Sequence, residues 1–283
     1  MQSTNNLVLP AHDFKADFEN GSIFFVGTAT VLLRYAGFTI LTDPNFLHKG
    51  DHVHLGYGLR STRLTNPALE IEQLPPLDFL LLSHMHEDHF DRVAEEKLDR
   101  NLPIVTTSHA TAKLKKKGFN ALHALNTWET ISLTKGDARL NITAMPGIHG
   151  PSILGALLPP VMGSMLEFQT PNRETKFRIY ISGDTLVHEQ LKEIPQRYPN
   201  IDLALLHLGG TKAFGILLTM DAKQGIKAIQ IINPRTAIPI HYNDYTVFKS
   251  SLEEFMDAIA QAGLEHKVKY LDPGDTYQFH ISS

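Results

Sequence analysis

The chain has 283 residues, of which 26 are basic and 30 acidic, and its net charge of −4 offers no electrostatic support for nucleic-acid binding, where a basic stripe is expected. It contains no cysteine, so disulfides and thiolate ligands are excluded and any metal must be held by imidazole and carboxylate groups. No secretory leader is visible and no apolar stretch approaches the roughly 18 residues that span a bilayer, so we expect a cytoplasmic protein without integral membrane contact.

Short runs of β-forming residues and longer runs with helical spacing follow one another along the chain. Strands are predicted over residues 23–26, 30–35, 38–42, 77–82, 104–107, 121–125, 140–144, 165–168, 177–181, 203–206, 237–240, 268–271 and 277–279. Helices are predicted over residues 91–100, 110–117, 222–231 and 250–262. Strands come first and then mix with helices, and no linker divides the chain. We therefore expect an α/β fold in one domain, residues 1–283, with stacked sheets and helices outside.

The segment at residues 84–89, HMHEDH, holds three imidazoles and two carboxylates within six residues. It follows the apolar run at residues 77–82, which is typical of a strand covered on both faces. His84 and His86 are two residues apart, so in an extended segment their side chains point the same way. Imidazole suits zinc, and a carboxylate oxygen admits zinc, iron or manganese. Because a polar loop rarely gathers so many ligand-type residues, the segment predicts a metal site.

This HxHxDH segment after an apolar strand resembles the signature of the metallo-β-lactamase superfamily. Other segments match the family in the same order along the chain, namely Thr42-Asp43-Pro44, His149 in PGIHG, Asp184 in SGDT and His241 in IPIHY. The resemblance covers about residues 20–280. It implies a four-layer αββα sandwich, in which two mixed β-sheets carry helices on their outer sides.

Within the superfamily, the chain is most similar to the branch containing N-acyl-phosphatidylethanolamine phospholipase D and the ascorbate-phosphate lactonases. The residues that suggest this are Arg63, the LPPLD run at residues 74–78, the GDT turn at residues 183–185 and the MDA segment at residues 220–222. His207 is a departure, because the chain has LHLGG at residues 206–210 where that branch shows a Pro–Ile–Gly stretch.

The resemblance also implies a site for two divalent metal ions, with zinc expected and manganese or iron as alternatives. The implied ligands are His84, His86 and His149 for one metal, Asp88, His89 and His241 for the other, and Asp184 as the bridge between them. A hydroxide shared by two such cations would attack a phosphorus or carbonyl centre. Asp88 is also the candidate catalytic residue, because it could orient that hydroxide or accept a proton. Asp43 is expected to support a ligand through a hydrogen bond rather than bind metal.

Taken alone, each of the later candidates has a plainer interpretation. His149 sits between glycines and could be an ordinary loop histidine. Asp184 could be the N-cap of a helix over residues 186–191. His241 could form a hydrogen bond in a strand–loop corner. The other histidines are expected on the surface or in structural roles, with those at positions 48, 52 and 54 as candidates for the mouth of the site.

Three segments are expected to wall the pocket: residues 45–67, the apolar residues 151–163, and residues 209–220. The substrate-binding candidates are Tyr57, Arg60, Arg63, His207 and Lys212. Arg60, Arg63 and Lys212 would hold an anionic group. Surface solvation of these bases and core packing of residues 151–163 are equally good alternatives.

We therefore expect a metal-dependent hydrolase of a small-molecule substrate, either a phosphodiester or a lactone or related ester. The residues do not choose between these bonds, because the same hydroxide serves both. One alternative is a non-catalytic metal-binding or regulatory module on the same fold. Another is an RNA-processing nuclease of the same superfamily. The net negative charge of the chain argues against this alternative. The oligomeric state is left open.

Overall fold

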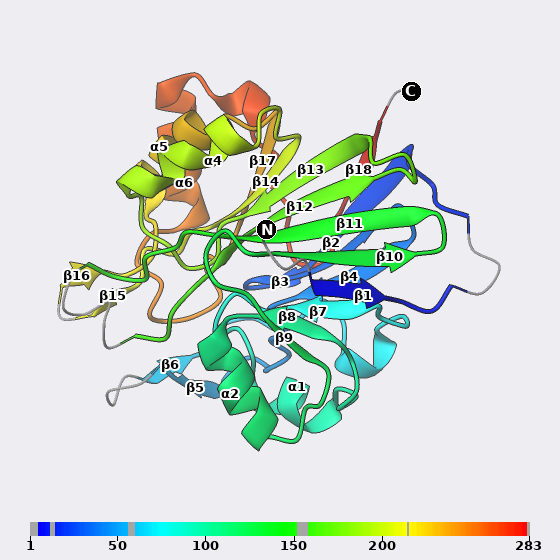
Figure 1. Ribbon diagram of the computed structural model, residues 1–283. Coiled ribbons are helices and arrows are strands. Elements are labelled where there is room, and N and C mark those ends of the chain that lie inside the picture. Colours follow the sequence, from blue (N-terminus) through cyan, green and yellow to red (C-terminus); the bar gives the residue numbers. More distant parts are fainter. Residues whose placement is uncertain (1–4, 12–14, 56–59, 152–157, 214, 282–283) are drawn as a thin grey trace.

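Two seven-stranded β-sheets face each other, and helices cover their outer sides, in the computed structural model (Figure 1). The structure describes residues 5–11, 15–55, 60–151, 158–213 and 215–281. Helices α1 and α2 lie against one sheet, and α4, α5 and α6 lie together at the other side of the molecule. This arrangement confirms the predicted αββα sandwich of two mixed sheets.

The first sheet joins strands from both ends of the chain. Its strands, in spatial order, are β1 (Asn5–Val8), β10 (Thr130–Lys135), β11 (Ala138–Met145), β12 (Gly163–Gln169), β13 (Thr175–Ile181), β14 (Leu203–His207) and β17 (Thr236–Ile240). Strands β10 to β13 are antiparallel neighbours, whereas β13, β14 and β17 run parallel. The carboxyl ends of these three parallel strands therefore meet at one edge of the sheet.

The second sheet has the same division into an antiparallel and a parallel half. Its strands, in spatial order, are β18 (Thr276–His280), β2 (Asn20–Gly27), β3 (Thr30–Tyr35), β4 (Phe38–Thr42), β7 (Phe79–Leu81), β8 (Ile104–Thr106) and β9 (Leu122–Ala124). Strands β18 to β4 are antiparallel, and β4, β7, β8 and β9 are parallel. The polar HMHEDH segment follows the carboxyl end of β7.

Alternation of side chains along the second sheet builds the layers. Phe79 and Leu81 of β7 join the core between the two sheets, whereas Leu80 and Leu82 join the core under α1 and α2. Successive side chains of a strand point to opposite faces, so a strand buried on both faces reads as a continuous apolar run. The predicted strand at residues 77–82 is confirmed for this reason.

The helices begin at polar caps. They are α1 (Arg92–Lys97), α2 (Ser108–Lys116), α4 (Glu193–Arg197), α5 (Ala222–Ile232) and α6 (Leu252–Ala262). The side chains of Asp91, Thr107, Asp221 and Ser251 accept backbone N–H groups at the starts of α1, α2, α5 and α6. Short elements complete the described chain: 3₁₀ turns at Ile71–Gln73, Glu189–Lys192 and Glu265–Lys267, and two hairpins, β5 (His52–His54) with β6 (Arg60–Thr62) and β15 (Lys212–Ala213) with β16 (Ile216–Leu217).

The structure differs from the predicted elements in several places. Strands β1, β5, β6, β10, β15 and β16 and helix α4 were not predicted. Residues 268–271 do not form a strand, and only Val268 makes an isolated bridge, to Ala237 of β17. No helix begins at Asp184, because the next helical turn starts at Glu189. None of the helices in the described residues is long and apolar enough to cross a membrane.

Candidate metal centre

The ends of the parallel strands bring the seven predicted ligands together. The HMHEDH segment follows β7, Asp184 follows β13, and His241 follows β17. His149 comes from the loop after β11. The seven side chains form two groups, within each of which the ligand atoms lie within 4.8 Å of one another. Residues far apart in sequence therefore converge on one place between the sheets.

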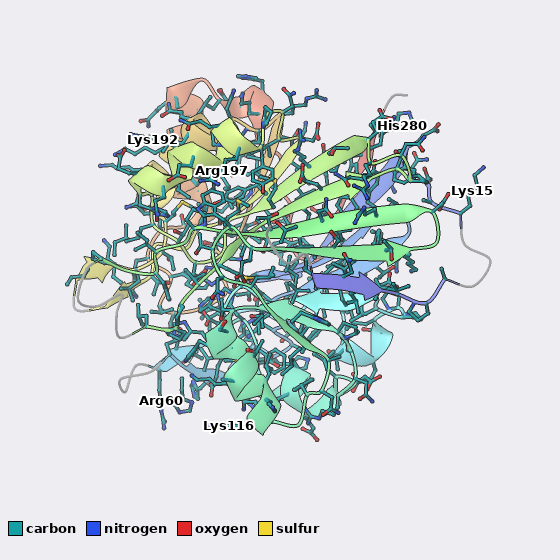
Figure 2. All side chains as sticks on the ribbon, viewed as in Figure 1. Lys15, Arg60, Lys116, Lys192, Arg197 and His280 are labelled. Atoms are coloured by element: carbon teal, nitrogen blue, oxygen red, sulfur yellow. The ribbon has the colours of Figure 1, made fainter. Side chains whose placement is uncertain are left out.

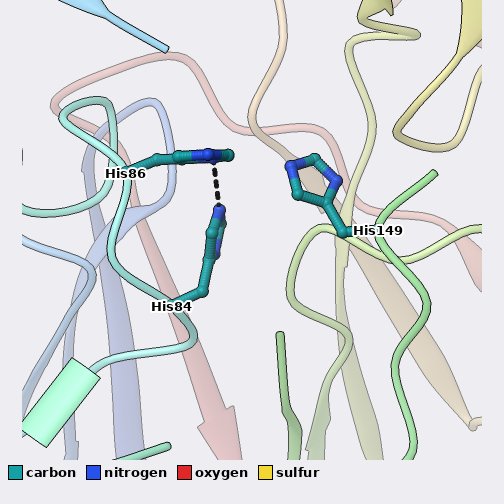
Figure 3. A group of neighbouring side chains, drawn as sticks. All are labelled: His84, His86 and His149. Atoms are coloured by element: carbon teal, nitrogen blue, oxygen red, sulfur yellow. Dashed lines mark hydrogen bonds between the residues drawn. The ribbon is translucent and has the colours of Figure 1, made fainter. Parts of the chain in front are cut away.

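The first group consists of His84, His86 and His149, which Figure 3 shows facing one another across the site. His84 Nε2 lies 3.0 Å from His86 Nδ1. The ring of His149 lies 5.2 Å from each of the other two rings. Burial, with the neighbouring charge of His89, lowers the pKa of His84 well below its usual value, and burial lowers the pKa of His86 to about 3. Three neutral imidazoles are the form in which histidine binds metal.

The second group consists of Asp88, His89, Asp184 and His241. His89 Nε2 lies 3.2 Å from Asp184 Oδ2, and His241 Nε2 lies 3.5 Å from Asp88 Oδ2. Burial alone would raise the pKa of Asp184, but the charges of His241 and His89 outweigh it and hold that pKa well below the usual value. Both carboxylates of the group are therefore ionised at neutral pH, because the pKa of Asp88 is lowered in the same way.

Asp184 stands between the two groups. Its Oδ2 lies 4.0 Å from His84 Nε2 of the first group and 3.2 Å from His89 Nε2 of the second. Its Oδ1 lies 3.6 Å from His241 Nδ1. This is the position expected of a carboxylate that bridges two cations.

Unsatisfied buried atoms show that the residues of the second group fit a metal ion. Asp88 Oδ1, His89 Nε2, Asp184 Oδ1 and His241 Nε2 are buried and have no hydrogen-bond partner among the described residues. Buried polar atoms normally have a partner, and leaving one unsatisfied costs about 1–3 kcal/mol. All four atoms belong to the same group and are of the nitrogen and oxygen types that zinc, iron and manganese accept. A cation at this place would satisfy all of them at once.

Hydrogen bonds behind the imidazoles fix which nitrogen faces the site. His149 Nδ1 donates to the carbonyl oxygen of Leu218 at 3.1 Å, and His241 Nδ1 donates to that of Leu208 at 3.3 Å. In a neutral ring this leaves Nε2 with the lone pair that can bind metal. Such partners orient a ligating histidine and set its tautomer.

Asp43 supports His89 in the same manner, as the sequence predicted. Its Oδ2 lies 3.2 Å from His89 Nδ1, and its Oδ1 accepts the backbone N–H of Ser83 at 2.7 Å. Asp43 is almost fully buried, and its backbone has a φ of 34° in the left-handed region. His241 also has a positive φ, 64°. Strained non-glycine backbone of this kind is concentrated at functional sites.

His207 belongs to this supporting network and not to a substrate pocket. It is fully buried at the end of β14, its Nε2 lies 3.3 Å from Asp43 Oδ2, and its ring stacks on that of His89. Its backbone N–H donates to Ser182 Oγ at 2.9 Å. The prediction that His207 contacts substrate is therefore corrected. Its ring contacts the carboxylate of Asp43, which in turn contacts His89.

Comparison with known proteins agrees with this geometry. Residues 39–242 match the beta-lactamase superfamily domain. The chain belongs to the beta-lactamase superfamily. A UPF0173 metal-dependent hydrolase of Nanoarchaeum equitans is 28% identical over 197 residues, covering 69% of this chain and 83% of the relative. A UPF0173 metal-dependent hydrolase of Caldivirga maquilingensis is 25% identical over 262 residues, covering 92% and 99%.

Solved structures show the same superfamily fold. The isothiocyanate hydrolase from Delia radicum gut bacteria superposes with a TM-score of 0.78 at 22% identity, covering 92% of this chain and 100% of that one. Identity at this level supports the fold alone. The narrower resemblance to the N-acyl-phosphatidylethanolamine phospholipase D branch stays a prediction.

In this superfamily member a cavity of about 1100 Å³ opens beside the histidine triad, and His86 and His149 are part of its wall. His54 and Leu55 of the first hairpin, Met85 and Glu87, residues 147–150, and residues 158–161 also line it. Its size is that of a small-molecule site. The segments expected to wall the pocket at residues 45–67 and 151–163 therefore do so in part, and residues 209–220 do not among the lining residues described.

The structure places the predicted basic substrate contacts elsewhere. Arg63 is only 1% exposed, donates to Asn45 Oδ1 and to the carbonyl oxygen of Thr65, and lies over the ring of Tyr245. Lys212 lines a separate hollow with Asp221. Figure 2 shows Arg60 on the outside of the molecule. Tyr57 lies outside the described residues.

Proposed function

We propose that this chain is a metal-dependent hydrolase with a dinuclear site, in which zinc is the expected metal. One observation carries the proposal: five imidazoles and two carboxylates from both sheets form two adjacent ligand groups, with Asp184 between them. The first group would hold one cation, and Asp88, His89 and His241 would hold the second. Two divalent cations held by these residues would supply chemistry that lowers the pKa of water to about 7 and neutralises charge developing on oxygen.

Different residues of the site would bind the metal ions and activate the attacking water. His84, His86 and His149 would bind metal as neutral imidazoles, and His149 also lines the cavity where a substrate would enter. Asp88 is ionised and has one carboxylate oxygen without a hydrogen-bond partner among the described residues. It is therefore suited to orient an attacking water and to accept its proton. No serine or cysteine nucleophile is required.

We propose a small molecule with a phosphodiester, lactone or related ester bond as substrate. The cavity supports a small molecule, because it has the volume of such sites and lies directly beside the triad. Both bond types develop negative charge on oxygen during hydrolysis, which is the charge that the site would neutralise. The names of the UPF0173 relatives, metal-dependent hydrolases, support the reaction class.

Metal analysis and a substrate screen test the proposal. Zinc-loaded protein should hold two metals per chain and should turn over at least one of bis-p-nitrophenyl phosphate, a simple lactone and a β-lactam. The Asp184→Asn variant should lose both metal content and rate, because it removes the bridging charge. As a matched control, Asp78→Asn removes a carboxylate that pairs with Lys135 away from the site, and it should keep both.

Two results would overturn the proposal. Full activity with two metals per chain in Asp184→Asn would show that the ligand assignment is wrong. Tight metal binding without turnover of any substrate class would favour a non-catalytic metal-binding module on the same fold.

A further inference from the structure

A stripe of basic side chains on α2 forms one wall of the cavity beside the histidine triad. His109, Lys113 and Lys117 follow one another at intervals of four residues and all line the cavity. Residues at this spacing lie on the same face of a helix. The stripe therefore faces the same space as His86 and His149, although none of its members was expected to contact substrate.

Most charged groups of this wall are already paired. Lys117 forms an ion pair with Glu95, and Arg92 forms one with Asp51 at 2.6 Å. Glu87 accepts the backbone N–H of His54 at 2.7 Å.

Lys113 is different, because it is exposed and forms no ion pair with any described residue. The pairs with Asp51 and Glu95 cancel the charges of Arg92 and Lys117, so among the described residues that line the cavity Lys113 is the one cation left without an ion pair.

His109 adds a second unsatisfied group to the stripe. Its Nδ1 is buried and has no hydrogen-bond partner among the described residues. Burial, together with the charge of Lys113, lowers the pKa of His109, so its ring is neutral at neutral pH. A neutral imidazole can still donate one hydrogen bond to an anion, here through Nε2, because the buried Nδ1 is out of reach of a ligand in the cavity. Lys113 and His109 thus offer a charge and a hydrogen bond from adjacent turns of one helix.

Other parts of the cavity wall are apolar. Leu158, Pro159, Pro160 and Val161 line it, as do Ile148 and Met85. A ligand that fills this space therefore contacts apolar side chains as well as His86, His149 and the α2 stripe.

We propose that Lys113 and His109 bind an anionic group, a carboxylate or a phosphate, of a substrate whose apolar body lies between this subsite and the metal centre. The substrate class is therefore an ester or phosphodiester with a second, distal anionic group. The identity of the bond that is cut rests on the proposed function, but recognition of the distal anion does not require turnover.

Binding of dicarboxylates to the zinc-loaded protein tests this subsite. Isothermal titration calorimetry would compare glutarate, adipate, pimelate and suberate with the monocarboxylate of matching length. One dicarboxylate should bind about three- to five-fold more tightly than its monocarboxylate, which is the upper part of the range expected for one solvated ion pair. This preference should shrink as salt is added, because the pair is exposed.

Two variants of the same helix make the test specific. Lys113→Gln should abolish the dicarboxylate preference and leave monocarboxylate binding unchanged. Lys116→Gln is the matched control, because it removes the same charge from α2 but lies outside the residues described as lining the cavity, at the outer end of the helix in Figure 2. It should keep the preference. Both changes preserve helix propensity.

The outcomes separate this proposal from the proposed hydrolase. A preference that is absent in the native protein, persists in Lys113→Gln, or is lost in Lys116→Gln would overturn the subsite. A Lys113-dependent preference in a protein that hydrolyses none of the test substrates would support the subsite while contradicting the proposed function. Where an anionic ester is turned over, Lys113→Gln should raise its KM several-fold and leave kcat near the native value.

Discussion

Replacement of Asp43 by asparagine tests whether the groups behind the ligands control metal binding. Asp43 Oδ1 accepts the Ser83 N–H at 2.7 Å, and an asparagine carbonyl oxygen can keep that bond. The amide NH₂ would then take the place of Oδ2, which faces His89 Nδ1 at 3.2 Å and His207 Nε2 at 3.3 Å. Since an amide donates where the carboxylate accepted, His89 would shift its proton to Nε2. The Nε2 lone pair with which His89 would bind metal would be lost.

The size of the effect follows from this single change of tautomer. Loss of a supporting partner of a metal-binding histidine typically costs 10–100-fold in affinity. This corresponds to about 1.4–2.8 kcal/mol of binding free energy. The Asp43→Asn variant should therefore bind zinc about 10–100-fold more weakly in competition with a chromophoric chelator. Asp78→Asn, which removes a paired carboxylate elsewhere, should keep the native zinc affinity. An Asp43→Asn protein with zinc affinity within about twofold of the native protein would refute this reasoning.

Three further results are expected. His207→Gln should weaken zinc binding less than Asp43→Asn does. The double variant should bind zinc as Asp43→Asn alone does, because His207 acts through Asp43. Additive losses of zinc affinity in the double variant would contradict this. Gly183→Ala should lower the free energy of unfolding in urea by about 1–3 kcal/mol, since φ is 61° and a Cβ would lie 2.8 Å from the Met162 carbonyl oxygen. Gly118→Ala, with φ 88° and open space around it, should cost less. Removal of bound zinc with EDTA should lower the melting temperature by several degrees, because a ligand at 100 times its Kd stabilises the fold by about 2.7 kcal/mol; an unchanged melting temperature would argue against a bound metal.

Much of the sandwich could be predicted because its strands have clear local patterns. Buried parallel strands such as β7 and β14 are continuous apolar runs, and the polar segments after β7, β13 and β17 mark the edge where the site forms. Strand β10 has the sequence TISLTK, whose two apolar residues, Ile131 and Leu133, alternate with polar ones. This alternating pattern is short. The segment forms a strand because β11 and β1 pair with it on either side.

The substrate contacts could not be predicted, because they depend on partners distant in sequence. Arg63 looks like a surface base, yet Asn45 and the ring of Tyr245 accommodate its guanidinium in the interior. The basic helix at residues 110–117 was predicted, but its sequence does not show that Lys113 would face a cavity beside His149. The spacing of histidines and aspartates in the sequence identified the metal ligands. The residues of the cavity wall could be identified only from the packing of α2 beside the site.

Because the two sheets each contribute part of the ligand set, neither half of the polypeptide contains a complete site. A nascent chain emerging from the ribosome would carry His84, His86, Asp88 and His89 long before His241 had been synthesised. The last strand, β18, must then still pair with β2 near the other terminus. Loading of the proposed cation pair would thereby be confined to polypeptides whose translation has passed His241, and truncated products of this gene would lack the assembled centre.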